Sequence, residues 1–374
     1  MSQLASLSLT AFRSHASLRL ELQPGLVVLT GANGAGKTNI LEALSLLAPG
    51  RGLRGAKLAE FQKFDSTVPW AVSACVDDTQ LGTGRDPANP DAARRIAVID
   101  GQKASPQAFA EHLAISWLTP AMDRLWTDSP SSRRRFLDRL TTALEPSHAT
   151  HLSRYEDALA ERNRLLRDGV FDEIWLGGIE RTLATEGMAL AAHRRELVKQ
   201  LARYLPLSLE GVENWLDTLP ALLAEDRLRE ELAQSRRLDA AAGATTIGPH
   251  RTDLLAIHPD KNMPAALCST GEQKLLLIRL VLAHAECVRA RRGSPPVLLL
   301  DEICAHLDET RREDLFSTLQ DMGAQAFLTG ADSSLFASLS GRFMCYRLAD
   351  GQVQKHPQLT SALTSVSLDD TIVT

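Results

Sequence analysis

Apolar and polar residues alternate along the start of the chain and then give way to a short apolar run. Residues 4–9 and 18–22 carry leucines between polar positions, a period of two that is typical of strands with one buried face. Residues 26–29 are all apolar, as in strands that are covered on both faces. The pattern therefore predicts two half-exposed strands followed by one buried strand.

The next stretch predicts a helix and two further strands. Residues 38–48 place apolar side chains at helical spacing, and the Pro-Gly pair that follows ends the helix. Residues 68–76 and 94–100 are predicted to be strands. The Gly-, Pro- and Asp-rich residues 82–91 are predicted to form the turn region between them.

The middle of the chain has a different pattern. Residues 131–234 consist of long Arg-, Glu-, Leu- and Ala-rich segments without strand-like runs, which predicts a mainly helical insertion. Residues 152–166 and 179–197 carry short heptad seams, and Asp168 and Gly169 form a turn signal between them. The insertion is therefore either a short antiparallel hairpin or a packed bundle, and the spacing fits both.

Composition narrows the class of protein. A chain of 374 residues predicts two or three domains at about 150 residues each. The formal net charge is -5, so any affinity for nucleic acid requires a local basic patch. No apolar stretch approaches the roughly 18 residues of a membrane span, and no signal peptide precedes the first strand. The five cysteines are scattered without a C-x-x-C pair, so we expect a reduced, cytoplasmic protein without a membrane partner.

A phosphate-binding loop follows the buried strand and opens the predicted helix. Its residues match G-x-x-x-x-G-K-[ST] and are Gly31, Ala32, Asn33, Gly34, Ala35, Gly36, Lys37 and Thr38. Glycines allow the backbone N–H groups to wrap a phosphate at the positive end of a helix. Lys37 is predicted to reach the outer phosphates of ATP, and Thr38 is predicted to bind Mg²⁺ through its hydroxyl.

The acidic partner of such a loop lies far along the chain. Residues 296–300 predict a second buried strand, which ends at Asp301 and Glu302. Asp301 is predicted to hold the metal, and Glu302 is predicted to polarise the attacking water as the catalytic base.

A third element precedes a long apolar-rich helix. Ser269 and Glu272 have the spacing of a helix N-cap and its capping-box partner. Lying 32 positions before Asp301, the same residues resemble the signature of the ABC ATPases. That resemblance implies that Ser269 and Gly271 bind the ATP of a second subunit, that Asp308 belongs to a D-loop, and that two heads dimerise around two ATP molecules.

Spacing indicates which branch of this superfamily the chain resembles. Thr38 and Ser269 lie 231 positions apart, as in the split heads of chromosome-maintenance ATPases. The fold class is accordingly predicted as α/β, an ABC-type ATPase head with a β-rich N-terminal part and an inserted helical arm. The predicted domains are a first half of the head, the arm, a second half of the head and a loose tail, at residues 1–130, 131–240, 241–354 and 355–374.

Further residues resemble a bacterial DNA-repair branch of that superfamily. They are Phe12, Arg13, Gly50, Arg51, residues 129–138, Tyr155, Glu156, Arg162, Asn163 and residues 248–251. The resemblance implies a clamp that dimerises with ATP and Mg²⁺, grips single-stranded, gapped or double-stranded DNA, and releases it on slow, DNA-stimulated hydrolysis. It also implies recombination mediator proteins as partners, loading of the strand-exchange protein, and support of the SOS response.

The chain departs from that branch at three places. Glu302 replaces the usual Asp, which should preserve hydrolysis, and Ala305 and His306 replace a Ser-Glu pair before the D-loop. Only Thr329 and Gly330 stand where a Thr-rich switch is expected. No histidine occupies this switch position, so the sensor of the γ-phosphate is unassigned.

Arginines supply the candidates for contact with DNA. Arg133, Arg134 and Arg135 either face phosphates or form a solvated face, since three successive residues point in three directions on a helix. Arg51 and Arg54 follow the loop-bearing helix and could contact adenine, a partner subunit or DNA.

Three other functions fit parts of the pattern. The chain could be the ATPase subunit of a membrane transporter, the ATPase half of a nuclease that processes DNA ends, or a structural chromosome protein. Flotation with membranes would favour the transporter subunit, and a co-purifying nuclease would favour the nuclease half. DNA affinity that ATP leaves unchanged would favour the structural chromosome protein.

Overall fold

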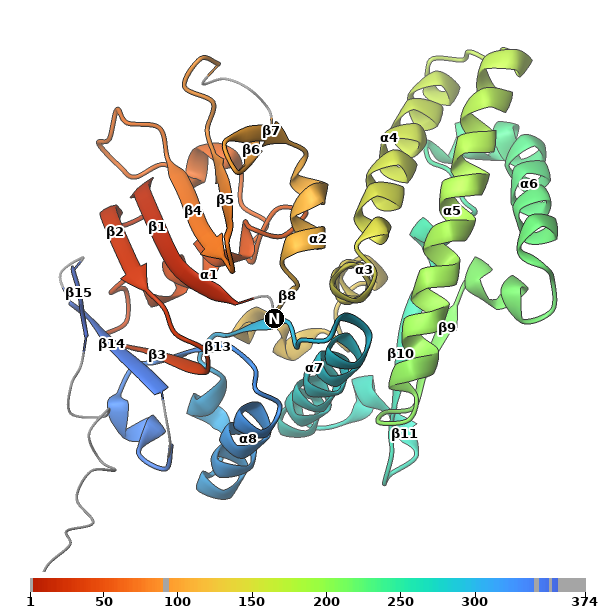
Figure 1. Cartoon of the computed structure of the whole chain (residues 1–374). Helices are drawn as coiled ribbons and strands as arrows, with labels where there is room; N and C mark the ends of the chain where they lie inside the picture. The colour runs from red at the N-terminus through yellow and green to blue at the C-terminus, as the bar shows by residue number, and fades with distance from the viewer. Residues whose placement is uncertain (1–2, 90–93, 340–342, 350–351, 356–374) are drawn as a thin grey trace, which may run out of the picture. The chain divides into compact units, whose positions relative to one another are not determined.

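Two units make up the chain in the computed structural model (Figure 1). One consists of residues 1–120 and 293–374, and the other of residues 121–292. The structure describes residues 3–89, 94–339, 343–349 and 352–355. The expected loose tail beyond residue 355 lies outside these ranges.

A mainly parallel sheet forms the centre of the first unit. Its order is β15-β14-β3-β13-β12-β8. These strands span Gln352–Lys355, Phe343–Ala349, Leu26–Thr30, Ala326–Gly330, Val297–Leu300 and Ile115–Leu118. Every residue of β3, β12 and β13 is buried, which explains why the two predicted buried strands read as continuous apolar runs. The same unit contains the helices α1 (Lys37–Ser45), α2 (Phe109–His112) and α8 (Glu309–Asp321).

A second, antiparallel sheet contains the strands of the β-rich N-terminal part. Its order is β2-β1-β4-β5-β6-β7. These strands span His15–Glu21, Leu4–Phe12, Ala71–Val76, Thr79–Gly84, Ile96–Ile99 and Gln102–Ala104. The predictions of strands near 4–22, 68–76 and 94–100 are confirmed.

The predicted turn region 82–91 is wrong at its start, because β5 continues to Gly84. A Cβ atom on Gly84 would lie 2.7 Å from the carbonyl oxygen of Trp70. Glycine is required at this position because two backbone segments approach closely. In the sequence alone the same glycine was interpreted as a turn signal.

Five helices and a small sheet form the described part of the second unit. The helices are α3 (Pro130–Leu144), α4 (Ser147–Arg167), α5 (Glu173–Leu201), α6 (Ala221–Ala242) and α7 (Thr270–Arg292). The sheet has the order β11-β10-β9, with strands at Met263–Pro264, Asp253–His258 and Leu207–Glu210. Residues 241–292 thus join the second unit by their contacts, whereas our predicted domains placed them in the head; the functional division into head and arm stays a prediction.

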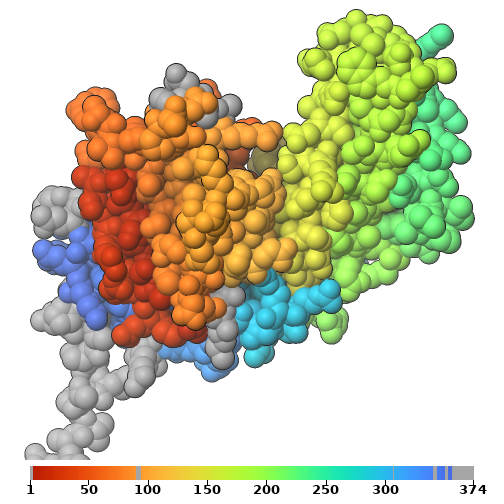
Figure 2. All heavy atoms as spheres, turned by 45° about the horizontal axis from the view of Figure 1, so that its top comes forward, coloured from red at the N-terminus to blue at the C-terminus, as the bar shows by residue number. Residues whose placement is uncertain are grey.

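Helices α4 and α5 form an antiparallel hairpin, one of the two arrangements that the heptad seams allowed. The chain reverses at Gly169, whose φ of 73° is the left-handed conformation that favours glycine. Leu183 and Leu190 are fully buried in the core of the hairpin, and α6 adds Leu228 to the same core. The arm is therefore a hairpin completed to a bundle by a third helix, and in Figure 2 residues of α4 and α5 (yellow to light green) form one continuous surface with part of α6 (blue-green) beside them.

Strand β9 corrects the prediction that residues 131–234 contain no strand. Leu207–Glu210 pairs in antiparallel register with β10, 43 to 49 positions further along the chain. Four residues are too short for a clear local pattern, so this strand depends on its distant partner.

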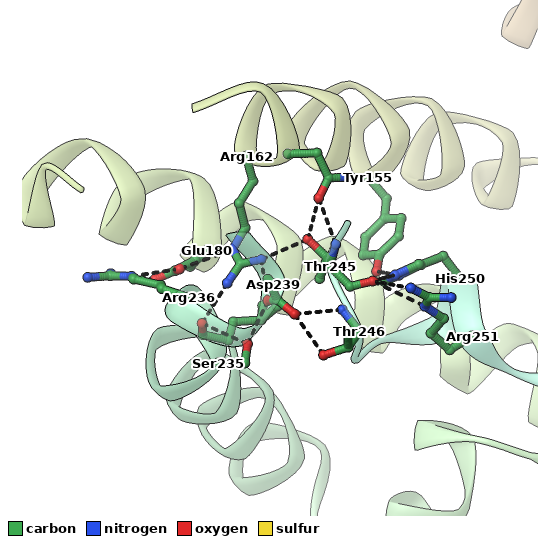
Figure 3. A network of polar contacts seen from close by, with 12 residues as sticks. Tyr155, Arg162, Glu180, Ser235, Arg236, Asp239, Thr245, Thr246, His250 and Arg251 are labelled. Atoms are coloured by element: carbon green, nitrogen blue, oxygen red, sulfur yellow. Dashed lines mark hydrogen bonds and ion pairs between the residues drawn. The ribbon is translucent and has the colours of Figure 1, made fainter. Parts of the chain in front are cut away.

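A polar network lies inside the three-helix bundle (Figure 3). The side chain of Arg162 is fully buried, and its guanidinium donates hydrogen bonds to Glu180, Asp239 and Thr245 and to the carbonyl of Leu232, at 3.1, 2.7, 2.7 and 2.6 Å. Arg236 forms a second ion pair with Glu180 at 2.6 Å. The network joins α4, α5 and α6 to the residues that follow α6.

Candidate nucleotide-binding site

The loop between β3 and α1 has the conformation that its glycines predict. Gly31, Gly34 and Gly36 have φ values of 145°, 85° and 99°. A Cβ atom on Gly36 would lie 2.8 Å from the hydroxyl of Ser14 and 2.9 Å from the ring of His15. Only glycine fits this wrapped backbone, which supplies N–H groups at the start of α1.

Lys37 folds back over this loop. Its ammonium donates hydrogen bonds to the carbonyl oxygens of Gly31 at 2.6 Å and Ala32 at 3.0 Å. Burial lowers the pKa of Lys37, and the negative charges of Glu302 and Asp301 oppose that shift. The cation is thus held at the loop, where the outer phosphates of a nucleotide would bind.

The two halves of the first unit bring Thr38 and Asp301 together. The Thr38 hydroxyl lies 3.0 and 3.1 Å from the two carboxylate oxygens of Asp301, although the residues are 263 positions apart. A hydroxyl and a carboxylate at this spacing are the hard oxygen donors that Mg²⁺ prefers. The donor set therefore fits the predicted metal, although no magnesium geometry follows from it.

Glu302 follows Asp301 in a left-handed conformation, with φ of 49° and ψ of 26°. Its backbone N–H donates to the hydroxyl of Thr329 at 2.8 Å, and that hydroxyl donates to Asp301 Oδ1 at 2.8 Å. Sequence analysis placed Thr329 at the position of an expected Thr-rich switch but gave it no contact in the site, because nothing local shows that β13 lies between β3 and β12.

A cleft of about 790 Å³ opens beside the loop. Its walls are residues 31–35 of the loop, Thr30, Ser14, residues 331–333 after β13, and residues 347–349 of β14. Sequence analysis missed Arg347 and its neighbours, which reach the site only because β14 pairs with β3.

The predicted signature residues lie at the start of α7, in the second unit. Ser269 and Glu272 form the capping box: the Ser269 N–H and hydroxyl both donate to Glu272 at 3.0 Å, and the Glu272 N–H donates back to Ser269 at 3.4 Å. The ion pair with Lys261, together with these bonds, lowers the pKa of Glu272 to about 2. No atom lies within 4 Å of a Cβ built on Gly271, so the chain's own packing does not require glycine there.

The remaining nucleotide-site candidate also caps a helix. Asp308 is the N-cap of α8 and accepts a hydrogen bond from the N–H of Arg311 at 2.9 Å. It is exposed, so the cap leaves its side chain accessible to solvent. Its role as a D-loop residue stays a prediction.

The candidate DNA-binding arginines have different surroundings. Arg133 is buried, and its guanidinium pairs with both oxygens of Asp253 at 2.7 Å. Arg134 donates to the carbonyl of Thr252 at 2.7 Å, and Arg135 is exposed. The expectation that these three residues point in three directions is confirmed, and Arg135 is the one of them that solvent reaches freely.

The other two candidates follow α1. Arg54 forms an ion pair with the fully buried carboxylate of Glu42 at 3.0 Å and a hydrogen bond with Asn39 at 3.1 Å. Arg13 shares the same carboxylate at 2.8 Å. Arg51 is exposed. The structure thus ties Arg54, but not Arg51, to the helix that carries Lys37 and Thr38.

Comparison with known proteins agrees with the fold and the site. The fold and the P-loop with its acidic partner define an ABC-type ATPase head, and the chain matches the RecF/RecN/SMC N-terminal domain over residues 3–353. It is 45% identical over 363 residues to the DNA replication and repair protein RecF of Allorhizobium ampelinum, covering 93% of this chain and 97% of that protein. The RecF protein of Mesorhizobium japonicum is also 45% identical, over 94% and 97% of the two chains. The chain belongs to the RecF family.

A solved structure supports the same assignment. The recombination mediator protein RecF in the RecFOR pathway, solved with ATP, has a TM-score of 0.81 at 25% identity, covering 95% of this chain and 99% of that chain. Within the described residues, no helix combines the length and apolarity needed to cross a lipid bilayer.

Proposed function

We propose that this protein is an ATP-dependent DNA-binding clamp of recombinational repair and replication restart. Membership of the RecF family supports the role in DNA repair. The observation that carries the proposal is the contact between Thr38 and Asp301, because it joins the phosphate loop to the acidic strand end in one site. Release of DNA would follow slow hydrolysis of ATP to ADP and phosphate, in the cytoplasm.

Each residue of the site has a distinct part in this proposal. Backbone N–H groups of residues 31–36 bind the phosphates, and Lys37 stabilises the negative charge that develops on them. Thr38 and Asp301 would hold Mg²⁺, which supplies positive charge that offsets the charge of the phosphates. Glu302 orients and deprotonates the attacking water.

Dimerisation would complete the site. Ser269, Gly271 and Asp308 are the residues proposed to contact ATP held by a second copy of the chain. The open space around Gly271 supports this role, since the chain's own packing leaves room there for a bound group. Arg51, Arg54 and Arg135 are the accessible candidates for DNA phosphates, and recombination mediator proteins are the proposed partners.

The substitution Lys37→Met tests the proposal. It removes the cation at the phosphates, so we expect ATP binding to weaken by about a hundredfold, as for loss of a charge-assisted hydrogen bond. ATP-dependent dimerisation, measured by sedimentation with Mg²⁺ present, and ATP-dependent tightening on gapped DNA, measured by fluorescence anisotropy at two salt concentrations, should be lost together.

Lys103→Met is the matched control, because Lys103 is an exposed lysine in the same unit. It should dimerise and bind DNA like the unmodified protein. A Lys37→Met protein that still dimerises with ATP would refute the proposed closure of two heads around nucleotide. If the unmodified protein binds ATP without any change in DNA affinity, the clamp is wrong and a structural chromosome role is favoured.

A further inference from the structure

The hydroxyl of Thr329 connects the two acidic residues of the site. It donates its proton to Asp301 Oδ1 and accepts the backbone N–H of Glu302, both at 2.8 Å. The same oxygen of Asp301 also accepts the hydroxyl of Thr38 at 3.0 Å. One threonine therefore links the metal-binding pair to the backbone of the proposed base.

The direction of these bonds is fixed by chemistry. A carboxylate oxygen only accepts and a backbone N–H only donates, so the Thr329 hydroxyl must donate to Asp301 and accept from Glu302. Its single proton then points at the carboxylate, which leaves a lone pair facing the N–H.

The conformation of Glu302 explains why it needs such a partner. A non-glycine residue in the left-handed region is strained and persists only where its surroundings hold it. The hydrogen bond to Thr329 fixes the N–H of that strained residue. Without it, Glu302 is free to relax towards a right-handed conformation, which would turn its side chain away from its present position.

The anchor itself is rigid. Thr329 is fully buried in β13, where it pairs in register with Leu29 of β3. A Cβ atom on Gly330, the next residue, would lie 2.7 Å from the ring of Phe336, so the backbone beyond Thr329 is also closely packed. A hydroxyl held by a central strand can define the position of a neighbouring loop.

We propose that Thr329 is a positioning residue for ATP hydrolysis, which holds Glu302 in its left-handed conformation and orients Asp301. This inference rests on the proposed function, since it assigns Glu302 as the base. Thr329 acts through these two residues, so hydrolysis depends on it far more than nucleotide binding does.

The test compares Thr329→Val with Thr329→Ser. Valine keeps the shape of threonine but removes the hydroxyl, and serine keeps the hydroxyl. We expect kcat of the valine variant to fall about tenfold, the effect of one lost hydrogen bond, while the Kd for ATP changes by less than about twofold. The serine variant should hydrolyse ATP within about twofold of the unmodified protein. Both are measured with Mg²⁺ and gapped DNA, and thermal denaturation reports folding.

The outcomes separate this inference from the proposed function. Normal hydrolysis by Thr329→Val while Glu302→Gln is inactive would overturn the positioning role and keep the base. Normal hydrolysis by Thr329→Val and also by Glu302→Gln would overturn the assignment of Glu302 as the base. Equal loss in the valine and serine variants, with a lowered melting temperature, would show that Thr329 acts through packing and would also overturn the inference.

Discussion

Three successive arginines at the start of α3 show how strongly position decides the role of one residue type. Arg133 pairs with Asp253 inside the second unit, whereas Arg135 is exposed to solvent. Only a guanidinium that solvent reaches can exchange counterions for DNA phosphates without first breaking an ion pair. The identity of three adjacent arginines thus says less about DNA binding than their direction on the helix.

We expect Arg135→Ala to affect DNA binding and Arg133→Ala to affect the stability of the fold. The first should weaken binding to gapped DNA at low salt and lower the slope of log Kd against log salt by about 1, with little change in stability. The second should leave the partly buried carboxylate of Asp253 without its cation and destabilise the protein by about 2 kcal/mol. Anisotropy titrations and thermal denaturation measure the two effects. Unchanged DNA affinity in Arg135→Ala would remove this residue from the candidate DNA contacts.

Sequence could predict the residues whose chemistry depends on their neighbours in the chain. The P-loop, the N-cap Ser269 and the acidic end of β12 all have local signals. Arg347 has none, and for Thr329 the sequence indicated only an expected switch position; both residues reach the site through strand pairings that only the fold creates. These pairings explain why the cleft lining and the link to Glu302 could not be predicted.

At the level of elements, strongly periodic segments were predicted correctly from the sequence, whereas short or glycine-containing strands were not. The strands at the start of the chain and α1 follow directly from their patterns, and the hairpin of α4 and α5 is one of the two arrangements that its heptad seams allow. Strands β5 and β9 did not, since one contains glycines and the other has four residues. Tertiary contact decides such elements more than local preference does.

The arm shows the same limit for charged residues. Arg162 lies on α4 among other arginines, and nothing in its neighbours distinguishes it from a solvated side chain. In the fold it is fully buried and joins three helices (Figure 3). Its partners come from α5 and α6, so its burial follows from the bundle.

Replacing Arg162 should therefore destabilise the arm. Arg162→Met fills much of the same volume but leaves the fully buried carboxylate of Asp239 without its cation, and we expect a loss of about 3–5 kcal/mol. Glu180 keeps Arg236 as an ion-pair partner, so its carboxylate contributes less to the loss of stability. Urea unfolding followed by circular dichroism, with proteolysis of the arm, measures the loss.

Arg229→Met is the matched control for that experiment. Arg229 also lies in the arm, but it and its partner Asp226 are both about half exposed. Its loss should change stability by less than about 1 kcal/mol, as for other surface ion pairs. Equal stability of the two variants would show that the buried network contributes nothing to the arm.

For the whole molecule, the order and spacing of the motifs along the chain predicted most of the architecture. The first unit is assembled from both ends of the chain, and the Thr38–Asp301 contact crosses 263 positions. A long insertion between a P-loop and its acidic partner predicts such a split unit. The extent of the second unit was not predictable, because α7 and β10 join it through contacts that local pattern does not show.

One buried and two partly buried histidines make the stability of the whole molecule sensitive to acid. Burial lowers the pKa of His284 in α7 to about 4, with a smaller contribution from Arg139 and an opposing one from its hydrogen bond to the Leu140 carbonyl at 2.8 Å. His193 and His250 are lowered to about 4 as well, also chiefly by burial. All three are therefore neutral in the folded protein at neutral pH.

The sign of the effect follows from these shifts. The unfolded chain takes up protons on these histidines below about pH 6.5, whereas the folded protein resists until about pH 4, so stability falls as pH decreases through that window. For His284 alone, we expect a loss of about 2 kcal/mol by pH 5. His284→Gln places an amide donor near the position of the ring Nε2 that bonds Leu140, without a titrating group, and should reduce the dependence of unfolding free energy on pH by about 1.4 kcal/mol per pH unit. Urea unfolding at a series of pH values from 7 to 5 measures this slope, and a glutamine variant with the slope of the unmodified protein would show that His284 already carries a proton when buried.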